Sequence, residues 1–208
     1  MTSVRLASDN NLQSTADTLQ SKQGMVLRFN ERRATEAAAR LLKLRGGRMK
    51  YLKLIKLLYF LDREALLRWG RPVTTDRYVS MDNGPVVSRI YELISEEPAP
   101  GTESVWRNHI SAPANWDVQL MREPETEELS RAEEALIEEI FANYGKMNRW
   151  DLVNLSHQFR EWRNPEGSAL PISYEDILRA GNKSDEEIAA TEAELDSLAA
   201  AESLLQPA

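Results

Sequence analysis

The chain has 208 residues, of which 42% are hydrophobic, and it carries a formal net charge of −7. This length and composition suit one compact domain with extensions. The absence of cysteine excludes disulfides, cysteine-based zinc sites and thiol catalysis, and it is compatible with a reducing compartment. No stretch approaches the roughly 18 apolar residues of a membrane-spanning helix, and the first residues lack the apolar centre of a signal peptide. We therefore expect a cytoplasmic protein without a membrane partner.

The charge is divided unevenly along the chain. Residues 123–208 carry a net charge of −13, which leaves +6 for the residues before them. The most basic stretch lies between Arg28 and Lys56. Such a stretch can bind nucleic acid, or its side chains can neutralise the acidic second half of the same chain. Nucleic acid is the less favoured partner, because these basic side chains fall on several helix faces and do not share one.

The first predicted elements are an arm and two helices. Residues 1–24 are polar without a sustained hydrophobic period, which predicts a flexible N-terminal arm. A helix is predicted at 31–44, with Asn30 as its N-cap and two glycines after its end. A second helix at 51–69 follows almost at once, so the two helices are expected to form an antiparallel pair.

The helix predicted at 51–69 is apolar around most of its circumference, which places it in the middle of the domain. Asp62 interrupts this apolar surface, because it lies four residues after Leu58 on a face that otherwise belongs to the core. A buried carboxylate needs a partner. We expect an ion pair with Arg77 or Arg89, or a capping interaction.

A second interpretation of this helix is catalytic. Asp62 would then be an acid with a perturbed pKa, working with Glu64 or Asp82. Neither a histidine nor a second carboxylate can be placed beside it from the sequence, so the structural role is favoured. Three basic residues of the helix fall near one stripe: Lys53, Lys56 and Arg63. We expect this stripe either to be the solvated edge of the helix or to neutralise the acidic second half of the chain.

The middle of the chain contains strand signals. Alternation over residues 76–81 predicts a short strand, with Tyr78 and Ser80 on one side. Two further short strands are predicted at 106–110 and 117–121. A small antiparallel sheet beside a helical core is therefore expected.

Capping signals predict the remaining helices. Pro85 follows Gly84 and is tolerated in a first helical turn, so a helix is predicted to begin there. Four later helices are each predicted by a capping box or a close approximation of one. These capping boxes begin at Ser130, Asn148, Ser173 and Ser184. The last helix is rich in acids and is expected to protrude or to fray. The sequence thus predicts a mainly α, α+β fold, in which helices surround a central apolar helix beside the small sheet.

Several segments of the chain, in their order and spacing, resemble one known family. In the first half these are Leu54-Ile-Lys-Leu-Leu-Tyr-Phe-Leu-Asp-Arg-Glu64, Gly70-Arg-Pro, Asp76-Arg-Tyr-Val and Gly84-Pro-Val. In the second half they are 148–157, Glu161-Trp162 and 171–178. This set resembles the Panacea antitoxin domain of SocA-like and phage-associated proteins. The resemblance covers roughly residues 29–178, and we place the domain at 25–182, before an acidic C-terminal helix or tail at 183–208.

The resemblance implies an antitoxin that binds and neutralises a cognate protein toxin. SocA-like members deliver their toxin to the protease ClpXP, and both delivery and direct blocking stay open for this chain, as does its oligomeric state. We predict no catalytic residue, cofactor or metal, because the sequence offers neither a histidine pair nor a phosphate-binding loop. The alternatives are a nucleic-acid-binding regulator and, less favoured, an enzyme that uses Asp62.

A toxin-binding surface needs exposed anchors, which are usually aromatic, methionine or arginine side chains. The candidate toxin contacts are Arg71, Arg77, Tyr78, Met81 and Asn83. Tyr78 and Met81 suit the core equally well. The structural framework of this surface is predicted to be Asp62, Arg63, Arg77, Gly84, Pro85 and Arg89.

Overall fold

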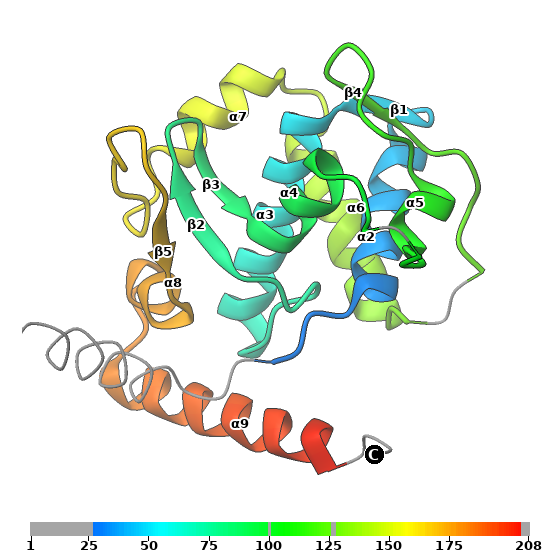
Figure 1. Cartoon of the computed structure of the whole chain (residues 1–208). Coiled ribbons are helices and arrows are strands. Elements are labelled where there is room, and N and C mark those ends of the chain that lie inside the picture. The colour runs from blue at the N-terminus through cyan, green and yellow to red at the C-terminus, as the bar shows by residue number, and fades with distance from the viewer. Residues whose placement is uncertain (1–26, 100, 126–127, 205–208) are drawn as a thin grey trace, which may run out of the picture.

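The computed structural model describes residues 27–99, 101–125 and 128–204. The arm predicted at 1–24 lies outside the described residues. Helix α3 (Tyr51–Trp69) passes through the middle of the molecule, with helices on one side and a sheet on the other (Figure 1). It contacts helices α2, α4, α6, α7 and α8 and strands β1 and β3. The predicted α+β fold around a central apolar helix is confirmed.

The first two helices have the predicted bounds. Helix α2 (Glu31–Leu44) begins after Asn30, whose side chain accepts a hydrogen bond from the Arg33 backbone N–H. Helix α3 ends at Gly70, which adopts a left-handed conformation that favours glycine. Between its ends α3 is buried on almost every side, because it packs against elements all around it.

The strands form two small antiparallel sheets. Strands β1 (Arg48–Lys50) and β4 (Asp117–Gln119) pair so that Met49 faces Val118. Strands β3 (Gly84–Val87), β2 (Tyr78–Met81) and β5 (Leu170–Ile172) form the second sheet in that order. Buried and half-buried residues alternate along β2, as its sequence predicts.

The prediction that a helix begins at Gly84 is wrong. Residues 84–87 form strand β3, and helix α4 (Ser88–Ser95) begins only after this strand. Pro85 is tolerated in β3 because β3 is an edge strand of its sheet, where a missing N–H costs little. Asp76, two residues before β2, accepts hydrogen bonds from the Arg89 and Ile90 backbone N–H groups in the first turn of α4 and so caps that helix.

The strand predicted at 106–110 is also wrong, since helix α5 (Val105–His109) occupies this segment. The Ser104 side chain caps α5 by accepting from the Arg107 N–H, and Trp106 is fully buried. Tertiary burial of the tryptophan therefore outweighs the strand propensity of the segment.

The later helices begin where their caps predict. Capping boxes at Ser130, Asn148 and Ser173 precede α6 (Arg131–Tyr144), α7 (Arg149–Ser156) and α8 (Tyr174–Ala180). Ser184 and Glu187 hydrogen bond to each other's backbone N–H at the start of α9 (Asp185–Leu204). Helix α9 runs along one end of the molecule in Figure 1 and buries Ile188, Leu195 and Ala199. Among the residues that the structure describes, no helix combines the length and apolar character needed to cross a membrane.

Candidate protein-binding surface

Asp62 is fully buried, as expected, but its partners are not cations. One carboxylate oxygen accepts hydrogen bonds from the backbone N–H groups of Val73 (2.9 Å) and Thr74 (2.8 Å). The other accepts from the hydroxyls of Thr74 and Tyr78, the latter at 3.1 Å. Burial raises the pKa of Asp62 to about 7, although the hydrogen bonds from Thr74 and Tyr78 oppose the shift. The expected ion pair is therefore wrong: Asp62 binds backbone and hydroxyl donors of the loop between α3 and β2 and of β2 itself, and no helix begins at these donors.

The two arginines proposed as partners of Asp62 are exposed. Their backbone N–H groups instead donate to Asp76, at 2.6 Å from Arg77 and 2.8 Å from Arg89. The Arg89 guanidinium pairs with Glu92 at 2.8 Å. Asp76, which sequence reasoning missed, is thus the second buried carboxylate of the framework. The available signal was its position as the first residue of the predicted strand, because an aspartate at the boundary of an element often accepts from nearby backbone.

The basic residues of α3 are not a solvated edge. The Lys53 ammonium donates to the carbonyls of Gly145 (2.7 Å) and Met147 (2.6 Å), and Lys56 is fully buried. Arg63 pairs with buried Glu161 at 2.6 Å. Lys53 and Arg63 therefore attach α3 to the segments before and after α7.

The β2–β3 turn packs tightly against α3 and α7. Lys56 donates to the Pro85 carbonyl at 2.6 Å, and burial lowers the pKa of Lys56 to about 7. Gly84 has a φ of +84°, and a Cβ there would overlap the Ser156 hydroxyl and lie 3.0 Å from the Lys56 Nζ. Gly84 and Pro85 therefore belong to a close contact between the turn, α3 and α7.

The candidate toxin contacts differ in their exposure to solvent. Tyr78 is buried, with its ring edge-on to Tyr59 at a centroid distance of 5.5 Å. Met81 is half-buried, and its carbonyl accepts from the Trp162 indole N–H at 3.1 Å. Exposed Arg71 lies before β2 and exposed Asn83 after it, so the strand separates them. Arg77 is the remaining exposed member.

The carboxylates of the enzymatic alternative do not converge. Glu64 pairs with Arg68 at 2.6 Å, and Asp82 accepts from the Gly167 N–H at 3.0 Å, while Asp62 is buried among its own donors. Within the described ranges, no group of three or more histidine or acidic side chains is arranged to hold a metal ion.

Several bases of the 28–56 stretch are paired within the chain. Arg33 forms an ion pair with buried Glu133. Arg40 pairs with Glu134 at 2.9 Å and with Glu138 at 2.6 Å, and Lys43 pairs with Glu123 at 2.7 Å. The alternative in which this stretch neutralises the acidic second half is therefore confirmed for α2.

A cleft of about 830 Å³ lies between the β1 region and the start of α7. It is lined by two aspartates, Asp117 and Asp151, and by six basic residues: Arg45, Arg48, Lys50, Lys53, Lys146 and Arg149. Asp117 already pairs with Arg48 (2.7 Å) and Lys50 (3.2 Å), and Asp151 belongs to the capping box of α7. The cleft therefore carries an excess of positive charge.

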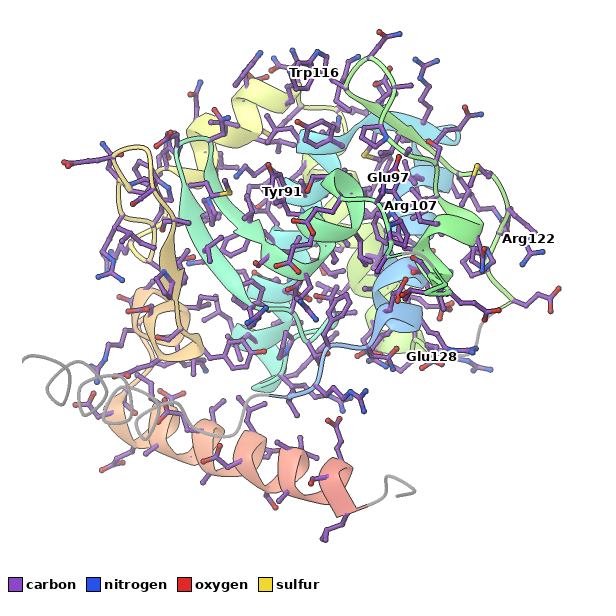
Figure 2. All side chains as sticks on the ribbon, in the orientation of Figure 1. Tyr91, Glu97, Arg107, Trp116, Arg122 and Glu128 are labelled. Carbon is purple, nitrogen blue, oxygen red and sulfur yellow. The ribbon has the colours of Figure 1, made fainter. Side chains whose placement is uncertain are left out.

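Two exposed tryptophans flank this cleft. Trp150, in the first turn of α7, is 51% exposed, and the Arg149 guanidinium lies 5.2 Å from its ring centre. Trp116 is 66% exposed and packs against Tyr51 at a centroid distance of 6.0 Å. Figure 2 shows Trp116 at the outer edge of the molecule, at the same end as α7 in Figure 1. Sequence reasoning missed both; the available signal was a tryptophan directly after a helix cap or within a turn.

The described fold and surface define a mainly helical α+β domain with one basic, tryptophan-flanked cleft. A family model described as "Antitoxin SocA-like, Panacea domain" matches residues 54–163. The chain belongs to this antitoxin family, whose membership implies a toxin partner. The match runs from within α3 to just beyond α7, so it is shorter than the resemblance at 29–178. No curated protein and no solved structure matches the chain significantly.

Proposed function

We propose that this protein is an antitoxin that binds a cognate protein toxin in the cytoplasm and neutralises it without catalysing a reaction. The family match over residues 54–163 carries this proposal. The buried polar framework supports it, because hydrogen bonds within the domain already engage Asp62 and Asp76. Such a rigid domain suits a binding role, since a preorganised surface loses little entropy on association.

The experiment is co-expression with the protein encoded by the neighbouring reading frame. We expect that protein to arrest growth when it is expressed alone and to be tolerated when the full chain is present. Direct binding of the two purified proteins, measured by calorimetry, should accompany rescue. A harmless neighbour, or rescue without binding, would contradict the proposal.

Neutralisation can occur by direct blocking or by delivery to a ClpXP-type protease. We propose direct blocking as the first mechanism to test, because it needs only a surface that covers the toxin. Rescue should then persist in cells that lack ClpXP, with the toxin at an unchanged level. Rescue that is lost in those cells, together with toxin accumulation, would instead assign the delivery mechanism.

A further inference from the structure

The cleft beside α7 holds cations that the described part of the chain does not neutralise. Arg45 and Lys146 are exposed and Arg149 is half-buried, and none of the three forms a salt bridge with a described residue. Burial, and after it the nearby charge of Arg45, lowers the pKa of Lys53. Clustered like charges are unfavourable in the isolated protein. An anionic partner would remove this repulsion.

Trp116 occupies a conformation that its own side chain disfavours. Ala114 and Asp117 hydrogen bond to each other across a two-residue turn, at 2.9 and 3.0 Å. The two central residues, Asn115 and Trp116, have φ angles of +52° and +68°. Glycine is the usual residue at the second position of such a turn, because a bulky side chain is strained there. Burial does not explain the tryptophan, since most of its surface is exposed.

The two tryptophans and the unpaired cations lie close together. The Tyr51 backbone N–H donates to the Trp116 carbonyl at 2.9 Å, and the two rings pack against each other. Lys50, which lines the cleft together with Arg149, donates to the carbonyl of the neighbouring Asn115 at 3.0 Å. Arg149 also lies beside the Trp150 ring. Tryptophan and arginine are the residues most often found to dominate the energy of protein interfaces. These side chains therefore form one continuous surface that combines aromatic area with positive charge.

We propose that this cleft binds an acidic segment of the toxin, with Trp116 and Trp150 holding apolar side chains on either side of its carboxylates. The inference rests on the proposed antitoxin function and adds the chemistry of the segment that is recognised. A protein segment is favoured over nucleic acid because the chain has a net charge of −7 and three basic residues of α2, Arg33, Arg40 and Lys43, form ion pairs within the chain. A long polyanion would meet the acidic remainder of the chain.

The first test measures binding of the purified neighbour-encoded toxin by calorimetry. The double variant Lys146→Glu/Arg149→Glu and the single variants Trp116→Ala and Trp150→Ala should each bind at least tenfold more weakly. These variants should fold, because Lys146, Trp116 and Trp150 are exposed and an acid at the position of half-buried Arg149, the first of α7, suits the helix dipole. Thermal melts verify this.

Matched controls change other parts of the surface. Arg32→Glu/Arg131→Glu makes the same change in charge at two exposed arginines outside the cleft, each in the first turn of a helix as Arg149 is. Trp69→Ala removes a tryptophan that is 37% exposed at the end of α3. Both controls should bind within about twofold of the wild type. Wild-type affinity in the cleft variants would overturn the cleft assignment while leaving the antitoxin function intact. A wild-type chain that binds no neighbour-encoded protein would overturn the function itself.

The second test identifies what occupies the cleft. A photo-crosslinking amino acid in place of Trp116 should join the chain to a toxin peptide of net negative charge, identified by mass spectrometry after co-expression. A nuclease-sensitive product would show that the cleft binds nucleic acid and would overturn the proposal. Crosslinking to a neutral or basic toxin peptide, or none despite rescue, would overturn it as well.

Discussion

Asp62 and Asp76 show how this domain buries carboxylates without burying cations beside them. Each carboxylate accepts hydrogen bonds from backbone N–H groups of a loop or of the first turn of a helix, where these donors would otherwise be unpaired. An unpaired buried N–H costs about 1–3 kcal/mol, so the hydrogen bonds offset much of the cost of desolvating the carboxylate. The two side chains therefore hold the segment that links α3 to β2 and α4.

Replacing Asp62 tests this role. Asp62→Ala removes the acceptor for two backbone and two hydroxyl donors, so the free energy of unfolding should fall by about 3–5 kcal/mol. Asp62→Asn keeps one carbonyl acceptor and should lose roughly half as much. Urea unfolding at neutral pH measures both, with the exposed Glu194→Ala as control. An unchanged urea unfolding curve for Asp62→Ala would show that the carboxylate does not contribute to the stability of the fold.

The same carboxyl group predicts a pH dependence. The pKa of Asp62 is raised by burial to about 7 from an ordinary value of 3.8. Between about pH 4 and 7 the native state therefore binds more protons than the unfolded state, so the contribution of Asp62 to stability falls as the pH rises.

Two other groups act in the opposite direction, because burial lowers the pKa values of His157 and Lys56. The pH dependence of stability must therefore be measured as the difference between the wild type and the Asp62→Asn variant. Relative to Asp62→Asn, the wild type should lose stability as the pH rises from about 4 to 7. Parallel stability curves for the two proteins would contradict the raised pKa.

At the scale of elements, the β2–β3 turn is held by contacts that distant parts of the chain supply. Lys56 on α3 donates to the Pro85 carbonyl, and Ser156 at the end of α7 fills the space where a Cβ of Gly84 would lie. The third strand of this sheet, β5, comes from far along the chain and pairs Ile172 with Tyr78. The turn therefore joins both halves of the domain.

Gly84→Ala measures how tightly this turn is packed. A left-handed backbone costs about 1–2 kcal/mol for a residue with a Cβ, and overpacking adds about 1–3 kcal/mol. The total loss in the free energy of unfolding should be about 3 kcal/mol. Gly167→Ala is the matched control, because its φ of +82° is similar and no atom lies within 4 Å of its added Cβ. Equal losses in the two variants would show that the turn is loosely packed.

At the scale of the whole molecule, the acidic C-terminal helix is attached through a narrow contact. Helix α9 contacts α8 and buries Ile188, Leu195 and Ala199, while its remaining residues are exposed or half-buried. The boundary at residue 182 is a prediction that follows from this attachment. The central core around α3 is formed largely by other elements.

Truncation of residues 183–208 tests that boundary. Lost apolar burial should be partly offset by the conformational entropy that the freed helix regains, so stability should fall by less than about 3 kcal/mol. Far-UV circular dichroism and urea unfolding should show a cooperative, folded chain with reduced helix content. A truncated chain that does not fold would place α9 within the domain.

Local patterns in the sequence determined the helices. Asn30, Ser130, Asn148 and Ser173 each mark the first turn of a helix, because a cap acts on backbone groups only two or three residues away. The apolar surface of α3 likewise determined its central place. The segment 54–64 within that helix carried much of the family resemblance, which the match at 54–163 confirmed.

Only the tertiary structure decided the partners of these elements. Asp62 found backbone donors rather than Arg77, residues 84–87 became a strand because β2 lies beside them, and Trp106 was buried in a helix. The basic cleft joins residues 45–53 to residues 146–151, which are distant in sequence. Such contacts depend on which surfaces meet in the fold. Hydrophobic periods and helix caps cannot predict them, because these patterns reflect interactions between residues that are only a few positions apart.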